Sequence, residues 1–256
     1  MLLSYHNLKI KSFGRGLKLV VKSDQIYKRR EIIRGKLKKC AEGTKEREEN
    51  ILRSYRHLKD KVYNIAYSND FEHFITFTVS SEMANRYSYY ECGTLIYKEL
   101  RRFKRKYKQF EYVMVPEQHE DGAWHYHALF KGIPKEEFRN SGKRDKEGRT
   151  IYNVIHVAEK VGHTTATRVG DRGKAAGYLV KYITKDMVKN DYVRNRRKYW
   201  ASRGADKTEI VRDYVENWPD YLKNLLNEND LISQTTSEVN NERFTNKLSY
   251  WLLAQP

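Results

Sequence analysis

The chain has 256 residues, with 50 Lys and Arg against 33 Asp and Glu, so its formal net charge is +17. This length allows one sizeable domain with appendages, or two small domains. The positive excess favours a polyanionic partner, nucleic acid before membrane, because contacts with phosphates release counterions. The alternative is a soluble basic protein without such a partner.

The N-terminal part, residues 1–66, is expected to be a basic helical extension. Its first residues, MLLSYHNLKIKS, lack the apolar core of a signal peptide, and no stretch approaches transmembrane length. The two cysteines, Cys40 and Cys92, lie far apart and outside any metal-ligand spacing. A cytoplasmic protein without a membrane partner is therefore expected. Between residues 45 and 67, apolar residues recur at spacings of three and four, which predicts an amphipathic helix.

Residues 67–204 mix strand and helix patterns without strict alternation, which predicts an α+β domain with an antiparallel sheet. The polar, glycine-containing segment 139–150 is expected to be a loop. Residues 205–256 combine short helical pieces with a Ser/Thr/Asn-rich stretch and are expected to form a helical and polar C-terminal extension. Strands are expected at 71–80, 111–118, 124–130 and 163–169, and helices at 88–108 and 174–189.

Two histidines, His125 and His127, flank Tyr126 within the expected strand 124–130. Because successive side chains of a strand point to opposite faces, both imidazoles lie on the same face. Such a pair either is satisfied by hydrogen bonds in the core or at the surface, or binds a divalent metal with positions left open to substrate.

A carboxylate would complete such a metal site. Glu117 lies on the neighbouring arm of the expected hairpin and comes beside His125 if the turn is near Asp121 and Gly122. His119 and Glu120 are closer to the turn and aim less well. Two histidines and one carboxylate suit Mg or Mn as well as Zn.

Tyr178, Lys181, Tyr182 and Lys185 follow the i, i+3, i+4, i+7 pattern and would share one helical face. Aromatic residues at this spacing usually pack in a core, but a core face does not normally interleave phenols with ammonium groups. Positive charge nearby favours the phenolate, and an ionised tyrosine is a nucleophile that can attack a metal-polarised phosphate. The pattern suits attack on a DNA phosphodiester that leaves the protein on the new 5′ phosphate.

The order FITFTVS, WHYHALF and YLVKYITK resembles the three motifs of the HUH endonuclease superfamily, specifically the rolling-circle replication initiators of bacterial phages and small plasmids. The resemblance covers roughly residues 52–204. It implies a five-stranded antiparallel sheet with flanking helices, similar to an RNA-recognition fold, with the histidines on a central strand. It also implies that His125, His127 and Glu117 hold a divalent metal, Mn or Mg.

The same resemblance implies roles for the remaining candidate residues. Tyr182 corresponds to the nucleophile of single-tyrosine members, and Tyr178 joins it in members with two tyrosines. Lys181 would contact the scissile phosphate or the metal-bound state, with Lys185 on the same expected face. DNA contacts are expected from the first motif and from the basic face of the 88–108 helix: Thr76, Thr78, Lys98, Arg101, Arg102, Lys104 and Arg105.

The expected function is a replication initiator that nicks single-stranded origin DNA, forms a 5′-phosphotyrosine link and later rejoins the strands. The chain has no Walker motif, so a host helicase would unwind the DNA and a host polymerase would copy it. Two alternatives remain open. One is a transposase or relaxase of the HUH type, and the other is a non-catalytic nucleic-acid-binding module that uses the sheet as a stacking platform.

Overall fold

The computed structural model describes residues 5–28, 44–189, 196–241 and 244–255. The chain forms two compact units, Cys40–Ala205 and a smaller one built from Met1–Lys39 together with Asp206–Pro256. The expected division differs from this one at its first boundary, because the helix at residues 45–68 belongs to the larger unit. In the described parts, no helix is long and apolar enough to span a bilayer.

The larger unit contains an antiparallel sheet in the order β6-β7-β8-β3-β5-β4-β9. This confirms the α+β class with an antiparallel sheet. The sheet has seven strands rather than five, because a hairpin adds an edge strand and a two-residue strand pairs at the other edge. Its strands are β3 (His73–Val79), β4 (Glu111–Gln118), β5 (Trp124–Lys131), β6 (Phe138–Arg144), β7 (Thr150–Val154), β8 (Gly162–Arg168) and β9 (Trp200–Ala201).

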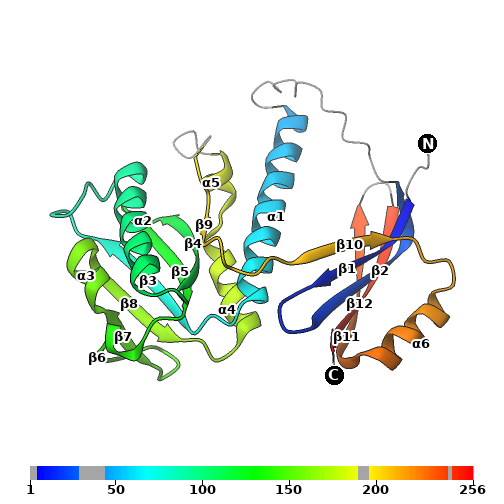
Figure 1. Cartoon of the computed structure of the whole chain (residues 1–256). Helices are drawn as coiled ribbons and strands as arrows, with labels where there is room; N and C mark the ends of the chain where they lie inside the picture. Colours follow the sequence, from blue (N-terminus) through cyan, green and yellow to red (C-terminus); the bar gives the residue numbers. More distant parts are fainter. Residues whose placement is uncertain (1–4, 29–43, 190–195, 242–243, 256) are drawn as a thin grey trace. The chain divides into compact units, whose positions relative to one another are not determined.

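Helices lie on both faces of this sheet (Figure 1). One face is covered by α2 and α3, and the other by α1, α4 and η2. The helices are α1 (Lys45–Ser68), α2 (Tyr89–Lys106), α3 (Ile155–Val161), α4 (Arg172–Leu179) and α5 (Lys185–Lys189), with 3-10 turns η1 (Lys135–Glu137) and η2 (Val180–Tyr182).

Strand alternation divides the central strands between these two faces. Ile75, Phe77 and Tyr126 are fully buried, and they join the apolar side of α2 in one hydrophobic core. Burial of each such side chain contributes about 1.5–3 kcal/mol. The Tyr126 hydroxyl donates a hydrogen bond to the carbonyl of Tyr89 in α2, at 3.1 Å. The opposite face of the same strands is therefore left to Thr76, Thr78, His125 and His127.

The expected loop at 139–150 is wrong, because this segment forms the arms of a β6–β7 hairpin. Asp145 stabilises the turn by accepting hydrogen bonds from the backbone N–H groups of Glu147 and Arg149, at 3.0 and 2.9 Å. Gly148 takes a φ of 76°, a conformation that favours glycine. The polar composition that suggested a loop reflects the exposure of an edge strand.

The single helix expected at 174–189 is also wrong. The α-helix α4 ends at Leu179 and continues as the 3-10 turn η2, after which Ile183 is extended. Thr184 then starts a new helix, α5, because its hydroxyl accepts a hydrogen bond from the backbone N–H of Met187 at 3.1 Å. The β-branched Val180, Ile183 and Thr184 reduce the helix propensity at this point.

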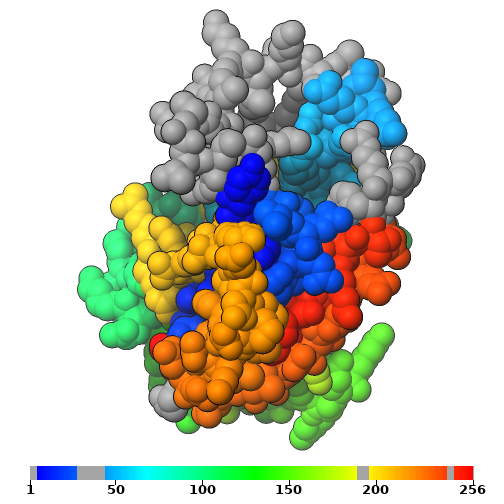
Figure 2. Space-filling model, turned by 90° about the vertical axis from the view of Figure 1, so that its right-hand side faces the viewer, coloured from blue at the N-terminus to red at the C-terminus, as the bar shows by residue number. Residues whose placement is uncertain are grey.

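The smaller unit is a five-stranded antiparallel sheet in the order β10-β1-β2-β12-β11. In Figure 2, segments from both ends of the chain, in blue and in orange to red, form one continuous surface. Helix α6 packs on this sheet, where Trp218 contacts the ring of Trp251. Its elements are β1 (Tyr5–Ser12), β2 (Leu17–Lys28), β10 (Glu209–Asp213), α6 (Trp218–Glu228), β11 (Asp230–Asn241) and β12 (Phe244–Ala254).

The expectation that both terminal extensions are helical is therefore wrong for the described residues, except for α1 and α6. Residues 29–43 of the N-terminal extension lie outside the described residues. The Ser/Thr/Asn-rich stretch is the edge strand β11, whose polar side chains are exposed. β12 has an apolar side, with Trp251 and Leu253 buried, that pairs with the equally apolar β2.

Candidate active site

The β4–β5 hairpin sets the relative positions of the carboxylate and the histidines. Gly122 takes a φ of 85° in the turn, and the Asp121 carboxylate accepts a hydrogen bond from the backbone N–H of Ala123 at 3.0 Å. This turn pairs Glu117 directly with His125. Residues paired across antiparallel strands share a face, so Glu117, His125 and His127 lie on the same side of the sheet, as the sequence predicts.

The imidazole of His127 is held from two sides. Its Nε2 lies 2.7 Å from Oε2 of Glu117, and its Nδ1 lies 3.1 Å from Oγ1 of Thr76. The side chain of His127 is 6% exposed, whereas that of Glu117 is 30% exposed. The pair of strands therefore fixes the ring of His127 with its Nε2 towards the half-exposed carboxylate.

The ionisation states of this cluster follow from burial and from the neighbouring charges. Burial lowers the pKa of His127, although the hydrogen bond and charge of Glu117 oppose this shift. Burial also lowers the pKa of His125, and positive charge on His119 and His127 adds to the effect. Burial alone would raise the pKa of Glu117, but the hydrogen bond with His127 and the positive charge of the three histidines leave that pKa below its usual value. The cluster thus favours neutral imidazoles beside an ionised carboxylate.

These three side chains have the donor chemistry of a divalent metal site. Metal ligation requires a neutral imidazole and an ionised carboxylate, which are the forms favoured here. Two ligand atoms at about 2.1 Å from a metal and at right angles to each other are about 3 Å apart. The 2.7 Å separation between His127 and Glu117 is close to this value. No group of three His, Cys, Asp or Glu side chains in the described residues is already arranged around a metal position.

The Thr76 hydroxyl occupies the position of a partner for a metal-bound histidine. A ligating imidazole normally donates its second N–H to an oxygen, which fixes the ring orientation and the tautomer. The contact of Nδ1 with Thr76 leaves Nε2 as the ligating atom. His125, His127 and Glu117 therefore fit the metal that the sequence predicts.

The two candidate nucleophiles lie beside this cluster. The ring of Tyr182 stacks on the imidazole of His127, with centroids 3.5 Å apart and planes 10° apart. The ring of Tyr178 stands perpendicular to that of Tyr182, with centroids 5.4 Å apart. Tyr178 is 47% exposed, whereas Tyr182 is half-buried. The tyrosine pair thus comes together as the sequence predicts, although the backbone between the two is a helix end and not a continuous helix.

The electrostatics of Tyr182 differ from the expectation that cations favour its ionised form. Burial raises its pKa, and the hydrogen bond with Tyr178 and the charge of Glu117 raise it further. The neighbouring lysine does not reverse this, because Nζ of Lys181 lies over the ring of Tyr178, 5.3 Å from its centroid. The phenol of Tyr182 is therefore protonated in this arrangement, and a cation is needed to make it a better nucleophile.

The other candidate residues are more scattered. Lys185 is exposed at the first position of α5, beyond the break that separates it from Tyr182. The basic residues of α2 lie over the sheet face opposite to His127. Arg102 is paired with Glu99 at 2.6 Å, and Lys104 with Glu111 at 2.5 Å, whereas Lys98, Arg101 and Arg105 are exposed. The role of this surface in DNA binding stays a prediction.

Two residues near the site have no role assigned from the sequence. Phe74 lies between the site rings, with its centroid 5.1 Å from that of Tyr178 and 6.0 Å from that of His127. His119 stacks on His125 at 5.0 Å. The sequence signal for Phe74 is its two-residue spacing from Thr76, which places it on the same face. His119 lies just before the hairpin turn, where strand alternation no longer predicts the direction of a side chain.

Comparison with known proteins gives one match. Residues 72–187 match the family model of the ORF2-type replication-associated proteins. The matched segment contains all of the histidine, carboxylate and tyrosine residues discussed above, and it fits a family of rolling-circle replication initiators. No curated protein matches the chain, and no solved structure does.

Proposed function

We propose that this protein, which carries a replication-associated segment of the rolling-circle initiator family, is a nickase that starts replication at single-stranded origin DNA. It would cut one phosphodiester by tyrosine attack, remain attached to the 5′ phosphate and later rejoin the strands. The fold proposed for the unit 40–205 is that of the HUH endonucleases. The proposed setting is the cytoplasm of a bacterial host.

The observation that carries this proposal is the stacking of Tyr182 on His127. The ring of the candidate nucleophile lies 3.5 Å from the imidazole whose Nε2 is 2.7 Å from the carboxylate of Glu117. A nucleophile must be held within reach of the groups that activate its target. A purely structural aromatic contact does not require a carboxylate on the same imidazole.

The proposed reaction is a transesterification. The hydroxyl oxygen of Tyr182 attacks the phosphorus, so that a Tyr–O–P bond forms as the bond from phosphorus to the 3′ oxygen breaks. The phenolic proton leaves for solvent, and the 3′ oxygen departs as a hydroxyl after taking up a proton. The number of phosphodiester links is unchanged, so the reverse reaction can rejoin a strand without another energy source.

His125, His127 and Glu117 would hold a divalent metal, Mn or Mg, which when bound polarises the scissile phosphate and favours the phenolate. His127 has a second role, because its ring orients that of Tyr182 by stacking. Thr76 orients His127 in turn. The proposed strand-contact residues are Thr78, Lys181 and Lys185, together with the exposed cations of α2.

Tyr178 is the proposed second nucleophile. Its ring lies 5.4 Å from that of Tyr182, and its greater exposure leaves it open to a second strand. A replication cycle needs one cleavage to begin and another to finish, so a second tyrosine can act while the first is esterified. A host helicase and polymerase would supply unwinding and synthesis.

The test is a covalent-adduct assay with single-stranded DNA that carries the candidate origin, in the presence and absence of Mn. A metal-dependent adduct is expected, and peptide mapping should place the phosphotyrosine at Tyr182. Tyr90→Phe, which changes an exposed tyrosine of α2, is the matched control and should still form the adduct. An adduct at neither Tyr178 nor Tyr182 would contradict the proposal.

A further inference from the structure

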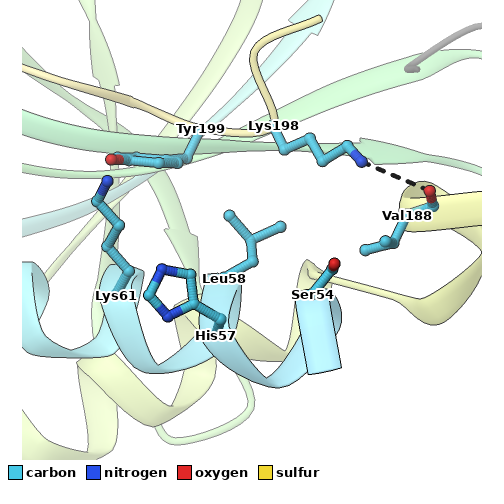
Figure 3. Close-up of a pocket in the computed structure, with 7 residues that line it drawn as sticks. All are labelled: Ser54, His57, Leu58, Lys61, Val188, Lys198 and Tyr199. Carbon is cyan, nitrogen blue, oxygen red and sulfur yellow. Dashed lines mark hydrogen bonds between the residues drawn. The ribbon is translucent and has the colours of Figure 1, made fainter. Parts of the chain in front are cut away.

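A pocket of about 270 Å³ lies in the larger unit beside the candidate active site (Figure 3). It is bounded by one side of α1, by α5 and by the segment that leads into β9. Its lining residues are Ser54, His57, Leu58, Lys61, Val188, Lys198 and Tyr199. Residues 54–61 and 198–199 lie outside the segment that matches the family model.

The pocket is cationic. Lys61 and Lys198 both line it, and no carboxylate is among the described residues that do so. Figure 3 shows the amine of Lys61 next to the Tyr199 ring, and Lys198 extended towards Val188. The ammonium of Lys198 contacts the carbonyl of Val188 at 3.5 Å, which is at the limit for a hydrogen bond. Within the described part of the chain, neither lysine forms an ion pair.

Lys198 is also partly removed from water. Burial lowers its pKa, and no compensating anion opposes this shift. The arginines before it in the chain have partners, since Arg196 lies over the ring of Tyr90 and Arg197 over that of Tyr97. A half-buried ammonium without an anionic partner is unfavourable by itself and is stabilised when an anion binds.

The pocket opens on the same side of the sheet as the candidate active site. Trp200 pairs with Met114 of β4 and contacts Tyr126, so its side chain lies on the α2 side. Its neighbour Tyr199 therefore faces the opposite side, the side of His127. β9, β4 and β5 are consecutive strands, so two strand spacings, about 10 Å, separate the position of Tyr199 from His127.

We propose that this pocket binds a phosphate group of the same single-stranded DNA, next to the phosphate that is cut. Lys61 and Lys198 would neutralise the phosphate, and Ser54 and His57 of α1 would donate hydrogen bonds to it. The ring of Tyr199 offers a surface on which the adjoining base can stack. This inference rests on the proposed function, because it makes the pocket the part that positions the strand relative to Tyr182.

Phosphate accounts for these observations better than a carboxylate ligand would. The volume is small for an organic ligand, and the donors come from three separate elements that surround one hollow. Two ammonium groups, a hydroxyl and an imidazole can bind several oxygens of one phosphate at once. An aromatic ring beside basic groups is typical of sites for single-stranded nucleic acid.

The first test measures how salt affects the binding of oligothymidylate, by fluorescence anisotropy. The protein carries Tyr182→Phe and no metal is added, so the result does not depend on cleavage. Adding Lys61→Gln and Lys198→Gln should reduce the slope of log affinity against log salt by about 0.7 for each phosphate that the protein no longer neutralises. Lys146→Gln with Lys160→Gln is the charge-matched control, at two exposed positions, and should leave the slope unchanged.

The second test keeps both lysines and so does not depend on the folding of the variant. Signals of Tyr199 and His57 are followed by NMR while oligothymidylate or inorganic phosphate is added. Shifts that appear at lower concentrations of oligothymidylate support a site for a strand phosphate. A response to inorganic phosphate alone, or an equal reduction of slope in the control variant, would overturn the inference. An unchanged pocket result with no covalent adduct would instead reject the proposed function.

Discussion

The hydroxyl of Thr76 lies 3.1 Å from Nδ1 of His127, so a residue of β3 fixes the ring of a candidate metal ligand on β5. The two residues are directly paired across the strands, and the contact is therefore set by the register of the sheet. The opposite nitrogen is 2.7 Å from the carboxylate of Glu117. Orientation of the ligand and stacking of Tyr182 thus depend on one imidazole.

Replacing the Thr76 hydroxyl should weaken metal binding without removing any ligand. Thr76→Val keeps the shape of the side chain, but it leaves Nδ1 of His127 without its partner. Removal of such a partner typically lowers metal affinity by about 10–100-fold. Calorimetric titration with Mn measures this change, and cleavage should recover when the Mn concentration is raised.

Thr78→Val is the matched control, because Thr78 shares the face of β3 with Thr76 but is paired with His125. Its Mn affinity should remain within about twofold of the original, well below the change expected when the partner of a ligand is removed. Equal reductions of affinity in the two variants would mean that Thr76 acts through packing and not through the Nδ1 contact.

Removing the metal ligands themselves should separate cleavage from binding. In a His125→Ala, His127→Ala variant we expect metal-dependent cleavage to be abolished, while most salt-sensitive DNA binding remains, since phosphate contacts elsewhere supply it. Gel assays of nicking and anisotropy of labelled DNA give the two readouts. Full cleavage by this variant would refute the metal site.

The two tyrosines should differ in the step that they affect. Tyr182→Phe keeps the ring that stacks on His127 but removes the attacking oxygen, so initial cleavage should fall by about 10³-fold or more, as for the removal of other nucleophiles. Tyr178→Phe should retain initial cleavage but complete strand transfer poorly. Single-turnover assays with a cleavage substrate and a pre-cut joining substrate separate these steps. Equal initial cleavage by both variants would mean that the roles are not divided in this way.

Local patterns are sufficient to predict the part of the fold that carries the site. The alternation in residues 124–130 places both histidines on one face, and the turn at Gly122 sets the pairing of Glu117 with His125. These features depend on neighbouring residues in the chain. The helices at 45–68 and 89–106 are likewise evident from their apolar spacing.

Long-range contacts decide what the sequence does not reveal. β2 pairs with β12 across more than half of the chain, and nothing in either segment names its partner. The helix at Tyr178 breaks where Tyr182 packs on His127, a tertiary contact that overrides the helical spacing of the two tyrosines. The raised pKa of Tyr182 follows from the same burial, which spacing alone does not disclose.

The exposed cations of α2 should affect affinity without affecting chemistry. This helix covers the sheet face opposite to His127, so Lys98, Arg101 and Arg105 lie away from Tyr182. Replacing the three with Gln should weaken single-stranded DNA binding at low salt, while the cleavage rate at saturating DNA stays the same. Unchanged affinity would remove this surface from the DNA-binding region.

Arg102 and Lys104 provide the comparison within the same helix. Each already has a carboxylate partner, Glu99 for Arg102 and Glu111 for Lys104. Arg102→Gln should therefore change DNA affinity less than Arg101→Gln, because part of its charge is neutralised within the protein. A larger effect of Arg102→Gln would show that the ion pair opens to bind DNA.

His73 should make the folded state less stable in mild acid. Its ring stacks on Phe138 at 4.1 Å, and its Nδ1 is buried without a hydrogen-bond partner in the described residues. Burial, together with the charge of Arg168, lowers its pKa from 6.5 to about 4. Between these values the unfolded chain binds the proton and the folded chain does not, so stability rises with pH across this window.

His73→Phe keeps the stacked ring and removes the titration. Relative to this variant, the original protein should lose up to about 1.4 kcal/mol of unfolding free energy for each pH unit below 6.5, with the difference levelling off near pH 4. Urea unfolding followed by circular dichroism at several pH values measures this difference. His163→Gln, at an exposed histidine of β8, is the control and should leave the pH dependence unchanged. Parallel curves for the original protein and His73→Phe would show that His73 is protonated as easily in the folded state as in the unfolded chain.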